Sequence, residues 1–351
     1  MPLILDVDTG IDDSLALLYA SASPDAELVA VTCVSGNVEA RQVAENTLAV
    51  LELGGRAEVE VALGREVPLV RQLRTAPETH GPRGLGYAEL PAASGEISDR
   101  HAADLFVAEA RRRPGEVTLV TLGPLTNLAL AVLREPELPR LLRRLVMMGG
   151  SYRSAGNTAP TTEWNIAVDP DAAAVVFEAF GRPDLPARPL ALGLDVTETA
   201  KFAPEHLAGL AERAGSRADG TVTGPANVNA VVRFIADALR FYMEFHSRYD
   251  GFYGAFIHDP LAVAAALDPA LVRAEAVSVQ VELGGTLTTG ETVTDWRRTW
   301  NRPPNVDVAV AADAASFLQR FIDRVGGLAA ERHRAALARS VPRPQPVRPT
   351  R

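Results

Sequence analysis

Short apolar runs alternate with longer segments of helical periodicity through the N-terminal part of the chain. The apolar runs are Leu3–Val7, Leu28–Val34, Glu58–Leu63, Val117–Leu122, Leu145–Met148 and Leu190–Leu194. The helical segments are Asp12–Ser21, Glu39–Leu53, Asp99–Arg113, Leu125–Arg134 and Asp171–Phe180. Runs without polar alternation indicate strands that are buried on both faces. The pattern therefore predicts an α/β fold, with an open, mostly parallel, Rossmann-like sheet flanked by helices. Ligands of such sheets bind beyond the carboxyl ends of the strands.

The organisation of the chain favours one domain. Within its 351 residues, no repeat and no linker marks a boundary. We predict a single catalytic domain over residues 1–328. Residues 329–351 are rich in Ala, Arg and Pro, and their last part alternates Pro with Arg, which predicts a partly disordered tail.

Composition excludes several classes of protein. Lys and Arg total 35 against 44 Asp and Glu, a net charge of −9, which argues against a nucleic-acid-binding surface. The longest apolar runs fall short of the ~18 residues that a membrane span needs. The single cysteine, Cys33, excludes an internal disulfide. A cytoplasmic enzyme without membrane or nucleic-acid partners is the class that remains.

Four carboxylates, those of Asp6, Asp8, Asp12 and Asp13, stand where the first strand gives way to the first helix. Gly10 permits a tight turn between them. Carboxylates this close raise each other's pKa unless a cation stabilises them. Ca²⁺ and Mg²⁺ take such oxygen ligands, so the cluster predicts a site for a hard cation. For any single aspartate, a helix cap or a buried hydrogen bond remains the alternative.

An opening Asp-x-Asp is also typical of metal-dependent phosphatases. Those enzymes need a cation near the transferred phosphate, but Lys201 is the only lysine of the chain and no Gly-x-x-x-x-Gly-Lys loop is present. An arginine could replace the lysine, so a metal-dependent phosphatase remains an alternative.

Seven motifs occur in the order in which one enzyme family carries them. They are Asp6-Val7-Asp8-Thr9-Gly10-Ile11-Asp12-Asp13, Ser35-Gly36-Asn37, His80-Gly81-Pro82-Arg83-Gly84-Leu85-Gly86, Gly123-Pro124-Leu125-Thr126-Asn127, Met148-Gly149-Gly150, Glu163-Trp164-Asn165 and His258-Asp259-Pro260. In these motifs the chain resembles the inosine–uridine-preferring nucleoside hydrolase family. The resemblance implies the nucleoside hydrolase fold, a homodimer or homotetramer, and Ca²⁺-dependent hydrolysis of ribonucleosides to free base and ribose. The alternative outside the enzymes is a non-catalytic nucleoside- or ribose-binding protein.

The resemblance also implies roles for individual residues. The metal ligands would be Asp8, Asp13, Asp259 and the backbone carbonyl of Thr126. The residues around the ribose would be Asp12 and Asn165 at the 2′- and 3′-hydroxyls, Asn157 and Glu163 near the 5′-hydroxyl, and Met148. Asn37 would lie beside the attacking water, which Asp8 would activate. His80 and His258 would lie on the base side.

His258 is further predicted to protonate or stabilise the departing base, because an unperturbed histidine pKa near 6.5 suits that task. Asp6 is predicted to orient the acidic cluster without binding the metal. Tyr242 and Tyr249 suit either an aromatic wall for the base or ordinary helix packing. The histidines without a neighbouring motif are predicted to be surface or helix residues; they are His101, His206, His246 and His333. Purine or pyrimidine preference stays open.

Overall fold

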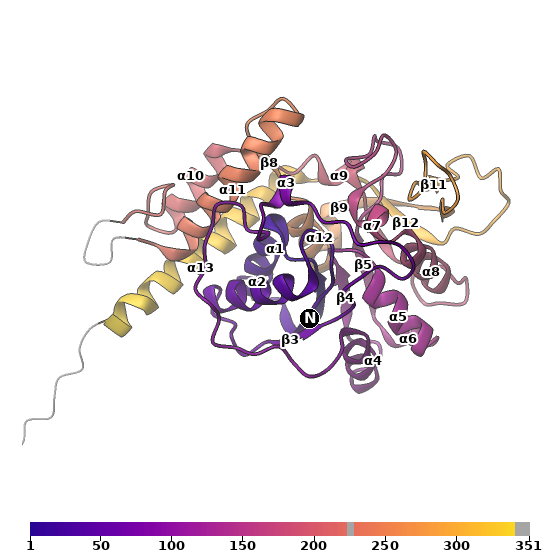
Figure 1. The fold of residues 1–351 in the computed structure, drawn as a ribbon, viewed down its shortest axis with the longest axis horizontal. Helices are drawn as coiled ribbons and strands as arrows, with labels where there is room; N and C mark the ends of the chain where they lie inside the picture. Colours follow the sequence, from indigo (N-terminus) through magenta and orange to yellow (C-terminus); the bar gives the residue numbers. More distant parts are fainter. Residues whose placement is uncertain (223–227, 341–351) are drawn as a thin grey trace, which may run out of the picture.

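The computed structural model describes residues 1–222 and 228–340, and its centre is an eight-stranded sheet (Figure 1). The order is β3-β2-β1-β4-β5-β6-β12-β9, and only β9 runs antiparallel to its neighbour. The strands of this sheet are β1 (Pro2–Val7), β2 (Glu27–Cys33), β3 (Glu60–Leu63), β4 (Thr118–Thr121), β5 (Arg144–Met148), β6 (Leu190–Leu192), β9 (Val272–Val277) and β12 (Val306–Ala312). The predicted open, mostly parallel α/β sheet is confirmed.

Helices cover both faces of the sheet (Figure 1). On one face lie α1 (Ile11–Ser21), α2 (Ala40–Leu53), α10 (Pro204–Arg213), α11 (Ala230–Tyr249), α12 (His258–Leu267) and α13 (Ala314–Ser340). On the other lie α4 (Ala102–Arg112), α5 (Thr126–Arg134), α6 (Leu138–Leu141), α7 (Trp164–Val168) and α8 (Pro170–Phe180). The short elements are α3 (Pro77–His80), α9 (Leu194–Thr197), η1 (Pro269–Leu271) and the strand pairs β7 (Lys201–Phe202) with β8 (Ala255–Phe256) and β10 (Val279–Val281) with β11 (Thr292–Thr294).

Strand β1 shows why the runs lack polar alternation. Leu3, Leu5 and Val7 point into one hydrophobic core, and Ile4 points into the other. Because successive side chains of a strand face opposite sides of the sheet, a strand between two helical layers needs apolar residues at almost every position. Asp6 is the exception, and it is completely buried.

The strand order places a crevice beside β1. The chain moves from β1 to β2 and β3 on one side, and returns to β4, β5 and β6 on the other. This reversal makes the carboxyl ends of β1 and β4 the topological switch point, where open α/β sheets bind their ligands. The loops that follow β1 and β4 begin with Asp8 and Leu122, so the acidic cluster lies at this crevice.

The C-terminal part differs from the sequence-based prediction. The expected domain boundary at residue 328 lies inside α13, which continues to Ser340, and Ala329 is fully buried against the core. Residues 341–351, the rest of the predicted tail, lie outside the described residues. Within the described ranges no helix is long and apolar enough to cross a membrane.

Candidate active site

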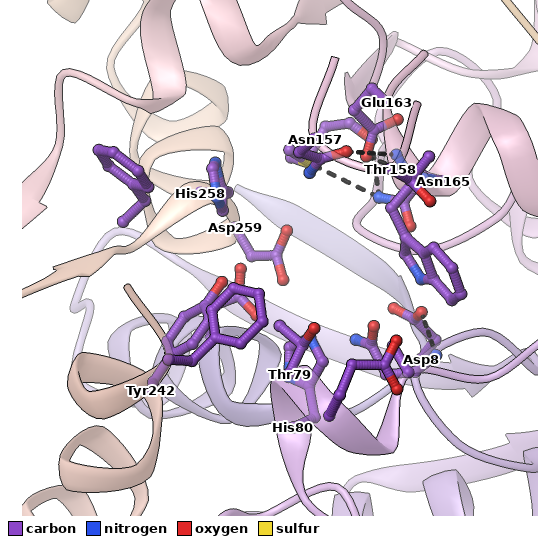
Figure 2. Close-up of a pocket in the computed structure, with 18 of the residues that line it drawn as sticks. Asp8, Thr79, His80, Asn157, Thr158, Glu163, Asn165, Tyr242, His258 and Asp259 are labelled. Carbon is purple, nitrogen blue, oxygen red and sulfur yellow. Dashed lines mark hydrogen bonds between the residues drawn. The ribbon is translucent and has the colours of Figure 1, made fainter. Parts of the chain in front are cut away.

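A cavity of about 580 Å³ opens at the carboxyl ends of the central strands (Figure 2). The cavity is lined by all but two of the site residues that the sequence predicts. The predicted residues that line it are Asp8, Asp12, Asn37, His80, Met148, Asn157, Glu163, Asn165, His258 and Asp259. The two others, Asp13 and Thr126, do not line the cavity. Segments that are far apart in the chain therefore converge on one site.

Three buried carboxylates meet at one point, and two of them, Asp12 and Asp259, form part of the floor of the cavity. Ligand oxygens of Asp12, Asp13 and Asp259 lie within 4.8 Å of one another, close enough to hold a metal ion. Asp13 also accepts hydrogen bonds from the backbone N–H groups of Asp8 (3.2 Å) and Gly10 (2.9 Å). These bonds fix Asp13 at the first turn of α1, whose N-terminus favours negative charge. Asp12, expected at the ribose, is thus also close enough to contribute a metal ligand.

Asp8 adds a fourth carboxylate with one oxygen free. Its Oδ2 accepts the backbone N–H of Asn37 at 2.8 Å, whereas its buried Oδ1 has no hydrogen-bond partner among the described residues. The amide Nδ2 of Asn37 donates to Asp13 Oδ2 at 3.2 Å, so one residue orients two carboxylates. Gly36 must be a glycine, because a Cβ there would lie 2.0 Å from Asp8 Oδ2.

Burial without a compensating cation raises the pKa values of these carboxyl groups strongly. Desolvation raises the pKa of Asp12 to about 8 and the pKa of Asp13 to about 6. Desolvation, followed by repulsion from neighbouring aspartates, raises the pKa of Asp8 and of Asp259 well above the ordinary value. A divalent cation would offset this cost by favouring the charged forms.

Asp6 and Thr126 lie behind this cluster. Oδ1 of Asp6 accepts hydrogen bonds from Thr32 Oγ1 at 2.6 Å and from Asn127 Nδ2 at 2.9 Å. Asp6 is not one of the carboxylates that meet at the cavity floor. The hydroxyl of Thr126 donates to Asp169 at 2.7 Å. Metal binding by the carbonyl of Thr126 stays a prediction.

A polar wall forms one end of the cavity, where Figure 2 shows Asn157, Thr158, Glu163 and Asn165 together. Glu163 caps α7: its carboxylate accepts the backbone N–H groups of Gly150, Asn165 and Ile166. The side-chain amide of Asn165 donates to the carbonyl of Leu122 at 2.7 Å and contacts the sulfur of Met148 at 3.4 Å. These bonds hold the wall rigid before any ligand binds.

The opposite end of the cavity carries His80, Tyr242 and His258 (Figure 2). Nδ1 of His80 accepts the backbone N–H of Ile11 at 3.1 Å. Because that N–H only donates, the neutral ring of His80 must carry its proton on Nε2. Burial lowers the pKa of His80 to about 3, which keeps the ring neutral near pH 7.

His258 differs from its expected protonation behaviour. Burial, with smaller contributions from His246 and His80, lowers the pKa of His258 to about 3. This value lies below the unperturbed pKa near 6.5 that would suit protonation of the base. Nδ1 of His258 lies 2.8 Å from the hydroxyl of Thr197, which fixes the ring orientation. Of the two predicted roles, stabilisation of the departing base by a neutral imidazole fits this environment better than protonation.

One face of α11 contributes residues that the motifs did not reveal. The cavity is also lined by Tyr242, Phe245, His246, Tyr249 and Asp250. Successive members of this set are three, one, three and one residues apart, which places them on a single face of a helix. Helical periodicity was therefore the sequence signal that could have indicated this wall of the cavity. His246, predicted to be a surface or helix residue, does lie on α11, but it is buried and lines the cavity: its Nδ1 lies 2.7 Å from Asp250 and its ring packs among aromatic side chains.

Comparison with known proteins agrees with this geometry. The family model described as inosine-uridine preferring nucleoside hydrolase matches residues 3–319. The inosine-uridine preferring nucleoside hydrolase of Crithidia fasciculata is 34% identical over 92% of this chain and 96% of its own length. The pyrimidine-specific ribonucleoside hydrolase RihA of Enterobacter sp. (strain 638) is 38% identical over 93% and 97%.

A solved structure supports the same assignment. The purine-preferring ribonucleoside hydrolase from Gardnerella vaginalis superposes with a TM-score of 0.84 at 32% identity, covering 94% of this chain and 100% of that chain. This chain therefore belongs to the inosine-uridine preferring nucleoside hydrolase family and is an enzyme that hydrolyses the N-glycosyl bond of ribonucleosides.

Proposed function

We propose that the enzyme is Ca²⁺-dependent and releases a free base and ribose through the residues of this cavity. The observation that supports this best is the group of buried carboxylates of Asp12, Asp13 and Asp259, together with the cavity-lining Asp8, whose Oδ1 lacks a partner among the described residues. A buried, unpaired carboxylate oxygen costs stability unless a ligand satisfies it. The donors are all oxygens, which suits Ca²⁺ or Mg²⁺ better than Zn²⁺.

Asp8, Asp13 and Asp259 would hold the ion, and the Thr126 carbonyl would complete the set. Among the carboxylates, Asp12, Asp13 and Asp259 are the three whose ligand oxygens lie within 4.8 Å of one another, so Asp12 could contribute as well. Bound Ca²⁺ would supply Lewis-acid polarisation of the attacking water and a template for the ribose hydroxyls. Asp8 is placed to accept the proton of that water. Asn37 holds the Asp8 carboxylate through its backbone N–H.

The reaction needs positive charge to be tolerated on the sugar. Cleavage of the C1′–N bond passes through an oxocarbenium-like state, as in glycoside hydrolysis. The carboxylates under the ribose favour that charge. The oxygen of water bonds to C1′, the electron pair of the broken bond goes to the base nitrogen, and one proton of the water ends on the base.

The base end of the cavity stabilises the leaving group. His80 presents an Nε2–H group, because its Nδ1 is occupied by the backbone of Ile11. His258, held by Thr197, presents its ring to the same end of the cavity (Figure 2). Tyr242 packs beside His80 at 5.5 Å between ring centroids and forms an aromatic wall. Homo-oligomerisation and a cytoplasmic location remain predictions.

A substrate panel tests this proposal. Purified enzyme would be assayed with inosine, uridine, cytidine, adenosine and guanosine, before and after treatment with a chelator. We expect base and ribose release that a chelator abolishes and added Ca²⁺ restores. Activity that resists exhaustive chelation would contradict metal dependence. Phosphate release from phosphate esters alone would favour the phosphatase alternative, and calorimetric binding without products would favour the binding protein.

The raised pKa values predict how metal-free stability depends on pH. A carboxyl group with a raised folded pKa retains a proton that the unfolded chain releases above its value of 3.8, so stability falls as pH rises toward the folded pKa. The buried His80 and His258 act oppositely, but only below their unfolded pKa of 6.5. Between pH 6.5 and about 8 the carboxyl groups therefore determine the slope.

In that window, chelated enzyme is expected to lose about 1.4 kcal/mol of unfolding free energy per pH unit for each proton retained. Bound Ca²⁺ removes the effect, since it holds its ligands in the charged form in the fold. Thermal unfolding at several pH values, with chelator or with excess Ca²⁺, measures both curves. Parallel curves would contradict a cation site built from these carboxylates.

A further inference from the structure

A second cavity of about 270 Å³ adjoins the active site. The two cavities share Arg74 and Thr158 in their linings. Thr158 follows Asn157, the residue expected near the ribose 5′-hydroxyl, and Figure 2 shows both at the polar end of the active site with Glu163. A substituent on the 5′-oxygen would therefore extend from the active site toward this second cavity.

The charge of the second cavity is opposite to that of the protein. Arg71 and Arg74 line it, together with several threonines, and no acidic side chain of the described residues does. The whole chain carries a net charge of −9, and the floor of the neighbouring active site is acidic. A cavity with two guanidinium groups is thus a local positive site beside the ribose end.

The two arginines differ in how they are held. Arg71 pairs with Asp171 at 2.6 Å and donates to the carbonyl of Leu283 at 3.0 Å, so its position is fixed. Arg74 is exposed and has no ion-pair partner in the described ranges; its guanidinium lies 5.7 Å above the ring of Trp164. Stacking on an aromatic face orients the guanidinium and leaves its N–H groups free for an anion.

Trp164 supplies an independent observation. Its buried Nε1–H lacks a hydrogen-bond acceptor among the described residues, although the ring lines the active site. Its backbone N–H donates to Asn157 at 2.9 Å, so the ring is tied to the 5′ end of the ribose site. The two carboxylate oxygens of Glu163 already accept three backbone N–H groups, and these hydrogen bonds weaken the repulsion between Glu163 and a bound anion. This end of the site therefore holds unused donors.

We propose that the second cavity binds a phosphoryl group carried on the ribose 5′-oxygen, so that the enzyme also accepts nucleoside 5′-monophosphates. The inference rests on the proposed function and extends its substrate class. The bond changes are those of nucleoside hydrolysis: water adds to C1′, the base leaves with the electron pair and gains a proton, and the product is ribose 5-phosphate. The phosphorus–oxygen bonds stay intact. Arg74 binds the phosphoryl group, which guanidinium groups match with paired N–H donors.

Base release from matched pairs tests the proposal, namely uridine against uridine 5′-monophosphate and inosine against inosine 5′-monophosphate. We expect the wild type to hydrolyse a monophosphate with kcat/KM within about tenfold of the nucleoside. Arg74→Gln is expected to lower kcat/KM about 10- to 100-fold on the monophosphate, as for loss of a charged hydrogen bond, and less than about twofold on the nucleoside. Arg74→Lys should retain part of the monophosphate activity.

Arg83→Gln is the matched control, because Arg83 is exposed and, like Arg74, lies between β3 and α4, but it lines neither cavity. It should leave both substrates unchanged. Equal losses in both variants, or a wild type that hydrolyses nucleosides but not monophosphates, would overturn the proposal and leave the nucleoside hydrolase function intact. Inhibition by inorganic phosphate without monophosphate hydrolysis would assign the cavity to the free anion and also overturn it. Absence of base release from every compound would instead refute the proposed function.

Discussion

Replacing Asp8 by Asn is expected to lower kcat on the best nucleoside of the panel by about a thousandfold or more, while the metal-free protein becomes more stable. Under the proposed mechanism, loss of the general base alone accounts for about 10²–10⁴-fold, and the same change removes a charged side chain proposed to bind the metal. Stability should rise because Asp8 is buried, its Oδ1 is unpaired among the described residues and burial raises its pKa well above the ordinary value. Kinetics, calcium calorimetry and thermal unfolding with chelator measure the three effects.

Asp6→Asn is the matched control for this prediction. Asp6 lies two residues earlier on β1, is equally buried, and has a pKa raised by desolvation to about 7. Its Oδ1 contacts Thr32 and Asn127, and its Oδ2, like Asp8 Oδ1, has no partner among the described residues, but Asp6 does not line the cavity whereas Asp8 does. We expect a loss of activity under about tenfold and little change in calcium affinity. Equal losses in the two variants would mean that the Asp8 effect is structural.

The sequence predicted the residues at the ends of strands well, for a physical reason. A strand buried between two helical layers is almost wholly apolar, so polar residues such as Asp8 or Asn37 stand out where such a strand ends. Parallel strands bring those ends together at one edge of the sheet, and the structure does place them around one cavity. Local pattern and topology suffice for this part of the site.

Periodicity was a weaker guide on α11. Its amphipathic pattern fits both packing and a cavity wall, since either requires one consistent face. On that face, Tyr242 is buried and 3% exposed, whereas Tyr249 is 59% exposed, although both line the cavity. His246 was missed because its partner Asp250 and the surrounding rings acquire meaning only once the helix is docked. Only the tertiary arrangement separates the two possibilities.

Protonation was likewise beyond the sequence. The pKa of His258 depends on its burial and on His246 and His80, which lie in distant segments of the chain. The second cavity has the same origin, since Arg71 and Arg74 meet Thr158 and Thr289 across the fold. Long-range contacts of this kind leave no motif in the chain.

Replacing His258 by Ala should reveal its role through the leaving group. A natural nucleobase is a poor leaving group that needs stabilisation as the C1′–N bond breaks, whereas p-nitrophenolate leaves readily without it. We expect kcat to fall about 10²–10⁴-fold on the best natural nucleoside and less than about tenfold on p-nitrophenyl riboside. Both substrates use the same ribose and metal sites. The ratio of the two losses in kcat therefore isolates the effect of His258 on the leaving group.

Thr197→Val tests whether the orientation of His258 matters. This change removes the hydroxyl 2.8 Å from Nδ1 of His258 and keeps the volume of the side chain nearly constant. The hydroxyl also donates to the carbonyl of Gly193 at 3.2 Å, so Thr197 ties the imidazole to the backbone of α9. We expect a smaller loss than in His258→Ala, again confined to natural nucleosides. A similar loss on p-nitrophenyl riboside in either variant would contradict leaving-group stabilisation, because it would place the defect at the ribose or the metal.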